Sequence, residues 1–320
     1  MKIRRQLFFA FWVFLLFLGL ILFFWSFRSV PFNEIVRVLG SLQLWKLIVL
    51  LALNLAILLI APSRWWLILR AQGNQVPYLA AARYRLAASA VSYFTPGQNF
   101  GGEPLLVISL RKHHKIKGSE ALAAVTLDRA IEAFGNFGVL AAGIAFVISL
   151  DLVWDMELQT PLLIALAALT IPVAYLAALW AGLRPVGRML RRFKNNFMAG
   201  VRSAEDGLGS LIRRKPALFA VGLAVSALVW SALFFEFWLA LNYLGLRLEL
   251  SQLVFVVTAG RLALLAPTPG ALGALEASQM LAVQALGFDS AYGLGLGLLI
   301  RARDILFALA GLVLGGLGLR

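Results

Sequence analysis

The chain has 320 residues, of which 61% are hydrophobic and only 14% charged, with a formal net charge of +14 and no cysteine. Soluble domains of this length are far less apolar, so the composition predicts an all-α, polytopic integral membrane protein with a single transmembrane domain over residues 1–320. The lack of cysteine excludes disulfide and thiolate chemistry. The basic residues cluster in short loops beside apolar segments, which favours a membrane orientation signal and speaks against nucleic-acid binding.

The first apolar segments are predicted to be membrane spans, oriented by the basic residues beside them. Residues 7–27 are long enough for one helix through the hydrocarbon core, and they lack the short apolar region and cleavage site of a signal peptide. Basic residues precede this segment and place the N-terminus in the cytoplasm. A second span, at about 44–69, is expected to return to the cytoplasmic face at Arg64 and Arg70.

Residues 81–110 form an apolar segment that is interrupted at Pro96-Gly97 and again at Gly101-Gly102. The basic residues before it and the basic loop 111–117 after it place both of its ends in the cytoplasm. Each half is too short for a full span, so we expect a re-entrant hairpin, broken in its middle.

The second half of the chain continues the alternation of spans and loops. The acidic loop 151–161 is expected on the outer face. The basic stretch 184–216 is expected to form the main cytoplasmic loop and to lie against anionic inner-leaflet lipids. Both termini are then cytoplasmic, in a multi-pass protein of the cell (inner or plasma) membrane. A second broken segment covers residues 252–287, and the remaining spans are predicted at 119–150, 162–183, 217–245 and 290–319.

One sequence pattern occurs twice. TPGQNFGGE at residues 95–103 matches TPGALGALE at residues 268–276, since in both a Thr-Pro-Gly is followed by five residues and a glutamate. An Arg-x-x-acid pair follows 26 residues after the first glutamate and 25 after the second. The first broken segment is expected to enter from the cytoplasm and the second from outside. The chain therefore predicts two inverted-topology repeats, at about 44–150 and 217–319, each with a re-entrant broken hairpin.

Such repeats place a transporter's substrate site near the midplane, where the broken helices meet. The amides of a half-helix that starts after each Thr-Pro-Gly would face an anion. Arg129 and Arg301 would hold phosphate through paired hydrogen bonds, and Glu103 and Glu276 would balance these arginines or carry a proton. The predicted substrate-binding residues are Arg85, Thr95, Gly97, Gly101, Gly102, Glu103, Asp128, Arg129, Glu132, Arg261, Thr268, Gly270, Glu276, Arg301 and Asp304.

A simpler interpretation stays open for the charged pairs. Arg129 with Glu132, and Arg301 with Asp304, are spaced as ion pairs on one helix face and would then only stabilise the bundle. No catalytic, metal or cofactor site is predicted, because the two histidines fall in the basic loop 111–117.

Four stretches resemble the flippase-like family, which is the transmembrane region shared with lysylphosphatidylglycerol synthases and includes uncharacterised membrane proteins. They are RWWLILRAQG (64–73), YFTPGQNFGGEPLLV (93–107), AAVTLDRAIEAFG (123–135) and LLAPTPGALGALEASQ (264–279). The resemblance covers nearly the whole chain and implies lipid translocation between leaflets. In the synthases an aminoacyl transferase domain follows the membrane region, and since this chain ends at Arg320 that activity is not expected. Relatives in lipid-linked sugar and hopanoid pathways leave the lipid undefined.

The sequence thus predicts a flippase, not an enzyme, for an anionic or headgroup-modified phospholipid or a polyprenyl-phosphate-linked lipid. An intramembrane lipid-modifying enzyme and an accessory subunit of lipid or glycolipid biosynthesis remain alternatives. The enzyme lacks support from any Asp-x-Asp pattern or cysteine, and an accessory subunit would not need paired intramembrane arginines and acids. The chain has no Walker motif for direct ATP use.

Overall fold

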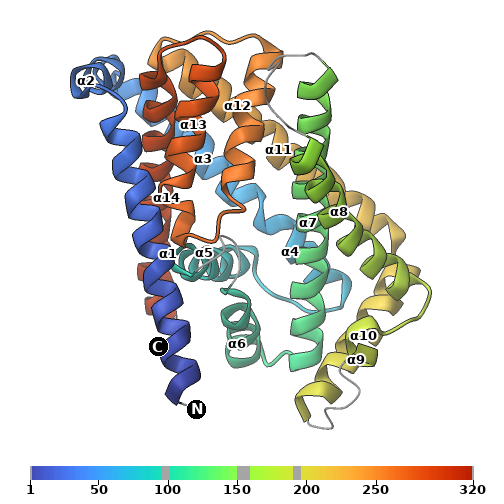
Figure 1. Cartoon of the computed structure of the whole chain (residues 1–320). Helices are drawn as coiled ribbons and strands as arrows, with labels where there is room; N and C mark the ends of the chain where they lie inside the picture. The colour runs from blue at the N-terminus through green and yellow to red at the C-terminus, as the bar shows by residue number, and fades with distance from the viewer. Residues whose placement is uncertain (1, 96–100, 150–158, 190–195, 319–320) are drawn as a thin grey trace.

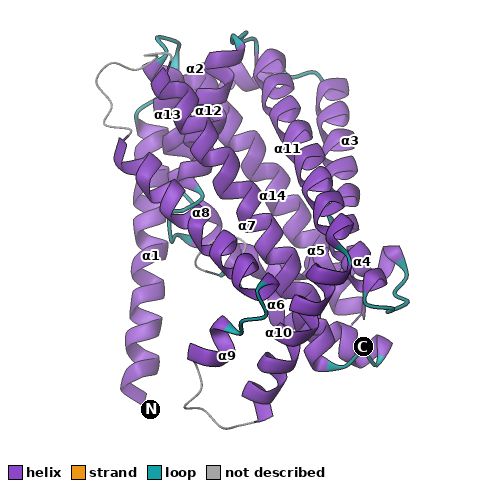
Figure 2. Cartoon of the chain, turned by 90° about the vertical axis from the view of Figure 1, so that its right-hand side faces the viewer, coloured by secondary structure: helices purple, strands orange, loops and turns teal. Residues whose placement is uncertain are grey.

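The computed structural model describes residues 2–95, 101–149, 159–189 and 196–318. Within these ranges every regular element is a helix (Figure 2), which confirms the all-helical prediction. The elements are α1 (Lys2–Arg28), α2 (Phe32–Gly40), α3 (Leu44–Ile60), α4 (Pro62–Ala71), α5 (Tyr78–Phe94), α6 (Glu103–His114), α7 (Gly118–Ser149), α8 (Gln159–Trp180), α9 (Pro185–Met189), α10 (Asn196–Arg214), α11 (Pro216–Leu244), α12 (Leu250–Ala263), the 3₁₀ turn η1 (Pro269–Ala271), α13 (Ala274–Ala285) and α14 (Ser290–Gly318).

Several helices are long and apolar enough to cross a membrane. They include Phe11–Arg28 in α1, Leu44–Ala71 across α3 and α4, and the whole of α7 and α11. The span across α3 and α4 divides at Pro62, which cannot donate a backbone hydrogen bond to the preceding turn. α14 is as long as α11, with 29 residues each, but it carries charged residues near its middle.

Two helical segments are interrupted inside the bundle. α5 ends at Phe94 and α6 begins at Glu103, while α12 and α13 are separated by η1. At the second interruption Gly270 and Gly273 have φ angles of +56° and +75°, a conformation that glycine adopts without steric cost. In Figure 1, α12 descends from the upper end of the bundle and α13 returns to it, whereas α6 runs from the centre toward the lower end. The interruption expected at Pro96-Gly97 lies outside the described residues.

The basic stretch 184–216, expected to be the main cytoplasmic connection between spans, is largely helical where the structure describes it. It contains α9 and α10, and α10 packs against α7 and α8. The reason lies in the spacing of its apolar residues: Ala204, Leu208 and Leu211 recur every three or four positions and are all buried against the bundle. Most of the acidic loop 151–161 lies outside the described residues.

The buried apolar side chains form two main clusters. One joins α2, α11, α12, α13 and α14, and the other joins α4, α5, α6, α7, α8 and α10. α1 packs against η1 and α13, which belong to the second interrupted segment. The fit is close, because a Cβ added at Gly273 would come within 2.2 Å of the carbonyl oxygen of Gly19.

Candidate functional site

A first group of buried charges joins α4, α5, α7 and α11. Arg64 donates from Nε to Oδ1 of Asp128 (2.6 Å), from Nη1 to Oγ of Ser226 (2.8 Å) and from Nη2 to Oε2 of Glu132 (3.2 Å). Arg85 also donates to Asp128, and its Nη2 lies 2.7 Å from Oε2 of Glu132. Two guanidinium groups thus share two carboxylates, which is how buried charges are normally tolerated.

Arg129 extends this group to the start of α6. Its Nη1 donates to Oε2 of Glu132 (2.9 Å). Its Nε lies 3.1 Å from Oε1 of Glu103, within ion-pair distance but not aligned for a hydrogen bond. The intrahelical pair expected between Arg129 and Glu132 is therefore present, and it belongs to a larger network.

All N–H donors of Arg301 on α14 are occupied, mostly by groups of the second interrupted segment. Its Nε and Nη2 bind the two carboxylate oxygens of Glu276 (2.7 and 3.0 Å). Its Nη1 donates to Oη of Tyr93 (3.0 Å) and to the carbonyl oxygen of Gly270 (2.5 Å), and Nη2 also donates to the carbonyl of Ala271 (3.2 Å). An arginine has five N–H donors, so the protein itself uses all of them.

The two motif glutamates have matching positions. Glu103 accepts a hydrogen bond from the amide of Gly101 (2.8 Å), and Glu276 accepts one from the amide of Gly273 (2.9 Å). Each also pairs with the arginine of the following long helix. Backbone donors at these helix starts, which the sequence analysis assigned to a substrate anion, are therefore partly used by the protein's own carboxylates.

A further group of polar residues, separate from those around Arg64 and Arg301, was not predicted from the sequence. Nη1 of Arg303 donates to both carboxylate oxygens of Glu236 (2.6 and 2.8 Å) and to Oδ1 of Asn54 (3.3 Å). Nδ2 of Asn54 also donates to Oε1 of Glu236 (3.0 Å). This group joins α3, α11 and α14. A signal existed, because Glu236 is the sole charged residue of the otherwise apolar α11, and a charge within a span needs a partner.

The ion pair expected between Arg301 and Asp304 is not formed. Instead, Nε and Nη2 of Arg303 bind Oδ1 of Asp304 at 2.9 and 2.8 Å. The spacing of three residues does place Arg301 and Asp304 on one helix face, but Glu276 from α13 provides a better aligned, two-oxygen partner for Arg301.

Arg261 on α12 differs from the other buried arginines. Its guanidinium carbon lies 4.5 Å from the centre of the Trp230 ring, a cation–π contact. Within the part of the chain that the structure describes, Arg261 forms no hydrogen bond or ion pair, and its Nε is buried without a partner.

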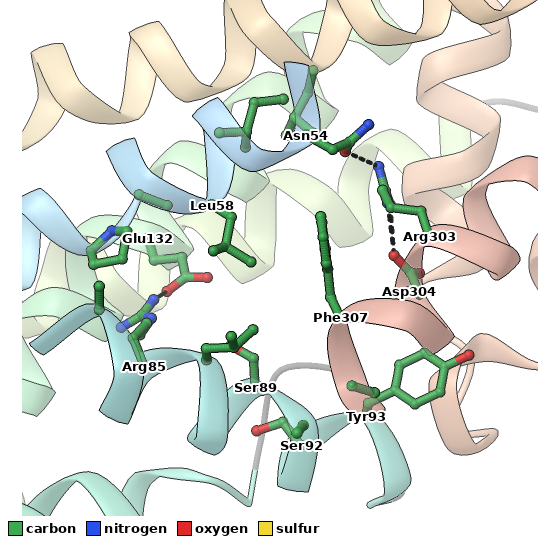
Figure 3. Close-up of a pocket in the computed structure, with 18 of the residues that line it drawn as sticks. Asn54, Leu58, Arg85, Ser89, Ser92, Tyr93, Glu132, Arg303, Asp304 and Phe307 are labelled. Atoms are coloured by element: carbon green, nitrogen blue, oxygen red, sulfur yellow. Dashed lines mark hydrogen bonds and ion pairs between the residues drawn. The ribbon is translucent and has the colours of Figure 1, made fainter. Parts of the chain in front are cut away.

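A cavity of about 310 Å³ lies between these groups. In Figure 3, Arg85 and Glu132 lie at one end, and Arg303 and Asp304 lie at the other. Its polar lining residues are Asn54, Arg85, Ser89, Ser92, Tyr93, Glu132, Arg261, Arg303 and Asp304. Four residues predicted from the sequence, Arg85, Glu132, Arg261 and Asp304, are among them.

Comparison with known proteins identifies the family. Residues 11–311 match the family described as the lysylphosphatidylglycerol synthase TM region. The chain belongs to this family. A relative described as a UPF0104 membrane protein, from Methanothermobacter thermautotrophicus, is 24% identical over 241 residues, which cover 70% of each chain. The resemblance found in the sequence is thereby confirmed, and the chain is a multi-pass membrane protein.

Four other predicted residues, two threonines and two glycines of the motifs, lie at the helix interruptions and outside the described lining of the cavity. Thr95 and Thr268 each donate to a nearby backbone carbonyl oxygen (2.9 and 3.2 Å). A Cβ added at Gly102 would lie 2.1 Å from a carbonyl oxygen of α5, and Gly101 has a φ of +112°. These four residues are not in the cavity lining that the structure describes, and Gly97 lies outside the described residues.

Proposed function

We propose that this protein moves an anionic lipid between the two leaflets of the membrane, and that the headgroup occupies the cavity beside Arg261. The observation that carries the proposal is the unpaired guanidinium at the cavity wall. Arg85 and Arg303 also line the cavity, but each is held by two carboxylates. A charged group inside a membrane bundle without a partner is costly, so an anionic ligand would complete the site.

Phosphate suits this position because it can accept two parallel hydrogen bonds from one guanidinium. The Arg261 guanidinium lies over the Trp230 ring, and in the described residues its N–H groups donate to no protein acceptor, so that a ligand oxygen could accept from them. We therefore assign headgroup binding to Arg261, and we assign Arg129 and Arg301, with Glu103 and Glu276, to holding the interrupted helices in place.

We further propose that residues 44–150 and 217–319 are inverted repeats with re-entrant hairpins. Three observations support this. The two interrupted segments approach the centre from opposite ends of the bundle (Figure 1). In the described residues, one of the two main apolar clusters is formed largely by α11 to α14 and the other largely by α4 to α8. The motif glutamates make equivalent contacts in the two halves. Inverted repeats with broken helices are typical of transporters.

The basic side chains of α9 and α10 give a basis for the proposed contact with anionic lipid headgroups. Arg188, Arg213 and Arg214 are exposed, as is Arg184 immediately before α9. The N-terminal end of α1 lies at the same end of the bundle as α9 and α10 (Figure 1). We propose that this end is cytoplasmic.

The test is a leaflet-exchange assay with purified protein in vesicles that contain a fluorescent anionic phospholipid. Arg261→Ala should lower the exchange rate about thirtyfold or more, because one desolvated phosphate contact contributes about 2–5 kcal/mol. Arg261→Lys should restore only part of the rate, since lysine cannot bind phosphate in parallel pairs.

Arg70→Ala is the matched control. Arg70 also stacks on a tryptophan, at 4.9 Å from the Trp66 ring, but it is exposed and does not line the cavity. Its exchange rate should equal that of the unmodified protein. Equal rates for the Arg261 and Arg70 variants would refute the assignment of the headgroup site.

A further inference from the structure

A second hollow, of about 230 Å³, shares Asn54 and Arg303 with the headgroup cavity. It is formed by α3, α11 and α14, and Glu236 is its third polar lining residue. The rest of its described lining is apolar, with leucines from α3 and leucine and isoleucine from α14. The cavity beside Arg261, which has polar groups at both ends, and the mainly apolar hollow thus meet at the Asn54–Arg303 contact.

The second hollow opens sideways toward the lipid-facing surface of the bundle. Its deep residues are buried, with Phe237 at 4% and Leu296 at 1% exposure. Its rim residues are exposed, with Leu47 at 39%, Leu51 at 40% and Leu306 at 49%. α11 packs against both α3 and α14 and forms the floor. The hollow is therefore a groove between α3 and α14 that hydrocarbon can enter from the side.

We propose that this groove binds a hydrocarbon tail of the same lipid whose headgroup lies at Arg261. The inference rests on the proposed function and extends it to the tail. Apolar walls accept an alkyl chain without desolvating any polar group, and because the chain comes from hydrocarbon and not from water, close packing against these walls would hold it. In the described residues, α3 and α14 are linked by one hydrogen bond, from Nη1 of Arg303 to Oδ1 of Asn54, and it is long at 3.3 Å.

The geometry also assigns a role to Arg303. Glu236 and Asp304 neutralise its charge, so that it borders the groove without presenting a free cation to the alkyl chain. Arg261 keeps free donors and would attract the phosphate. The two arginines would therefore separate the headgroup from the tail. Arg261 offers an uncompensated charge to the phosphate, whereas the charge of Arg303 is compensated by its carboxylates.

The experiment uses single-cysteine probes, which this cysteine-free chain permits. Ala302→Cys places a dye at the groove, since Ala302 lines it and is exposed. Ala56→Cys is the matched control on α3, exposed but outside both hollows. Each labelled protein is reconstituted in phosphatidylcholine with increasing phosphatidic acid that carries bromine on its acyl chains, which quenches the dye.

We expect half-maximal quenching at position 302 at about tenfold less brominated phosphatidic acid than at position 56, a preference of about 1.4 kcal/mol. Excess unbrominated phosphatidic acid should reverse the quenching at position 302. With Arg261→Ala added, the dye at position 302 should need as much brominated phosphatidic acid for half-maximal quenching as the dye at position 56. Equal quenching at both positions overturns the tail site, even where Arg261→Ala abolishes leaflet exchange and the proposed function stands. Preferential quenching that survives Arg261→Ala overturns the claim that one lipid occupies both hollows.

Discussion

At the scale of single residues, the buried arginines differ in what satisfies them. Arg301 has a two-oxygen carboxylate partner and three further acceptors, whereas Arg261, among the described residues, has the ring of Trp230 and no hydrogen-bond acceptor. A saturated buried arginine can hold its neighbours in fixed positions, and an unsaturated one has donors left for a ligand. Residue type alone does not separate these proposed roles, and the number of occupied donors is what distinguishes the two residues here.

We therefore expect Arg301→Ala to act on stability. Glu276 is fully buried, and without its partner it would be an uncompensated charge, which costs about 3–5 kcal/mol. The melting temperature in detergent should fall clearly. Adding Glu276→Gln should recover part of the loss, because the double variant removes the unpaired charge.

The control for this stability effect is Arg184→Ala. Arg184 pairs with Asp206 at 2.6 Å, but both side chains are about half exposed, and such pairs contribute less than about 1 kcal/mol. If Arg301→Ala melts like the Arg184 variant and only the exchange rate falls, Arg301 is a substrate residue and not a structural one.

At the scale of elements, the interrupted helices depend on glycines at close crossings. Gly273→Ala should weaken the contact between α1 and α13, because its φ is +75° and the added Cβ would lie 2.2 Å from the Gly19 carbonyl oxygen. Strain of this kind costs about 1–3 kcal/mol. The melting temperature in detergent measures it.

Gly138→Ala provides the opposite expectation on α7. A Cβ there meets nothing within 4 Å, so the helix should gain about 0.5–1 kcal/mol from the better helix former. The contrast in sign between the two glycine variants checks the argument; a loss of the same size in both would refute it.

The interrupted elements were also the part of the structure most open to prediction from sequence. The repeated Thr-Pro-Gly and glutamate correctly predicted the break between α12 and α13 and an interruption between α5 and α6, and the charge spacing found the arginines that pair with Glu103 and Glu276. The wrong pair, Arg301 with Asp304, shows the limit, since spacing along one helix does not reveal a competing partner on another. Asn54, Glu236 and Arg303 were missed for the same reason, because they are far apart in the sequence and meet only in the folded bundle.

At the scale of the whole molecule, the proposed inversion of the two halves requires a defined topology. The link between α11 and α12 and the link between α6 and α7 lie at opposite ends of the bundle (Figure 1). Arg247 and Lys117 are exposed in these two links. The basic residues near Lys117 favour the cytoplasmic side for that end.

In intact cells, an impermeant maleimide should label Arg247→Cys directly and Lys117→Cys only after permeabilisation. The cysteine-free chain provides the unlabelled background. Labelling of both positions before permeabilisation, or in the reverse order, would contradict the topology, and the reverse order would place the termini on the outside.

The packing of α1 against η1 and α13 has a consequence for the order in which the protein assembles during synthesis. α1 leaves the ribosome before α2 to α12, yet the surface it contacts, η1 and α13, is synthesised after all of them. Gly19 therefore lacks its Gly273 partner while α2 to α12 are being made. The Gly19–Gly273 crossing can close only when the second broken segment has entered the bundle, which makes the docking of α1 a late step in biogenesis.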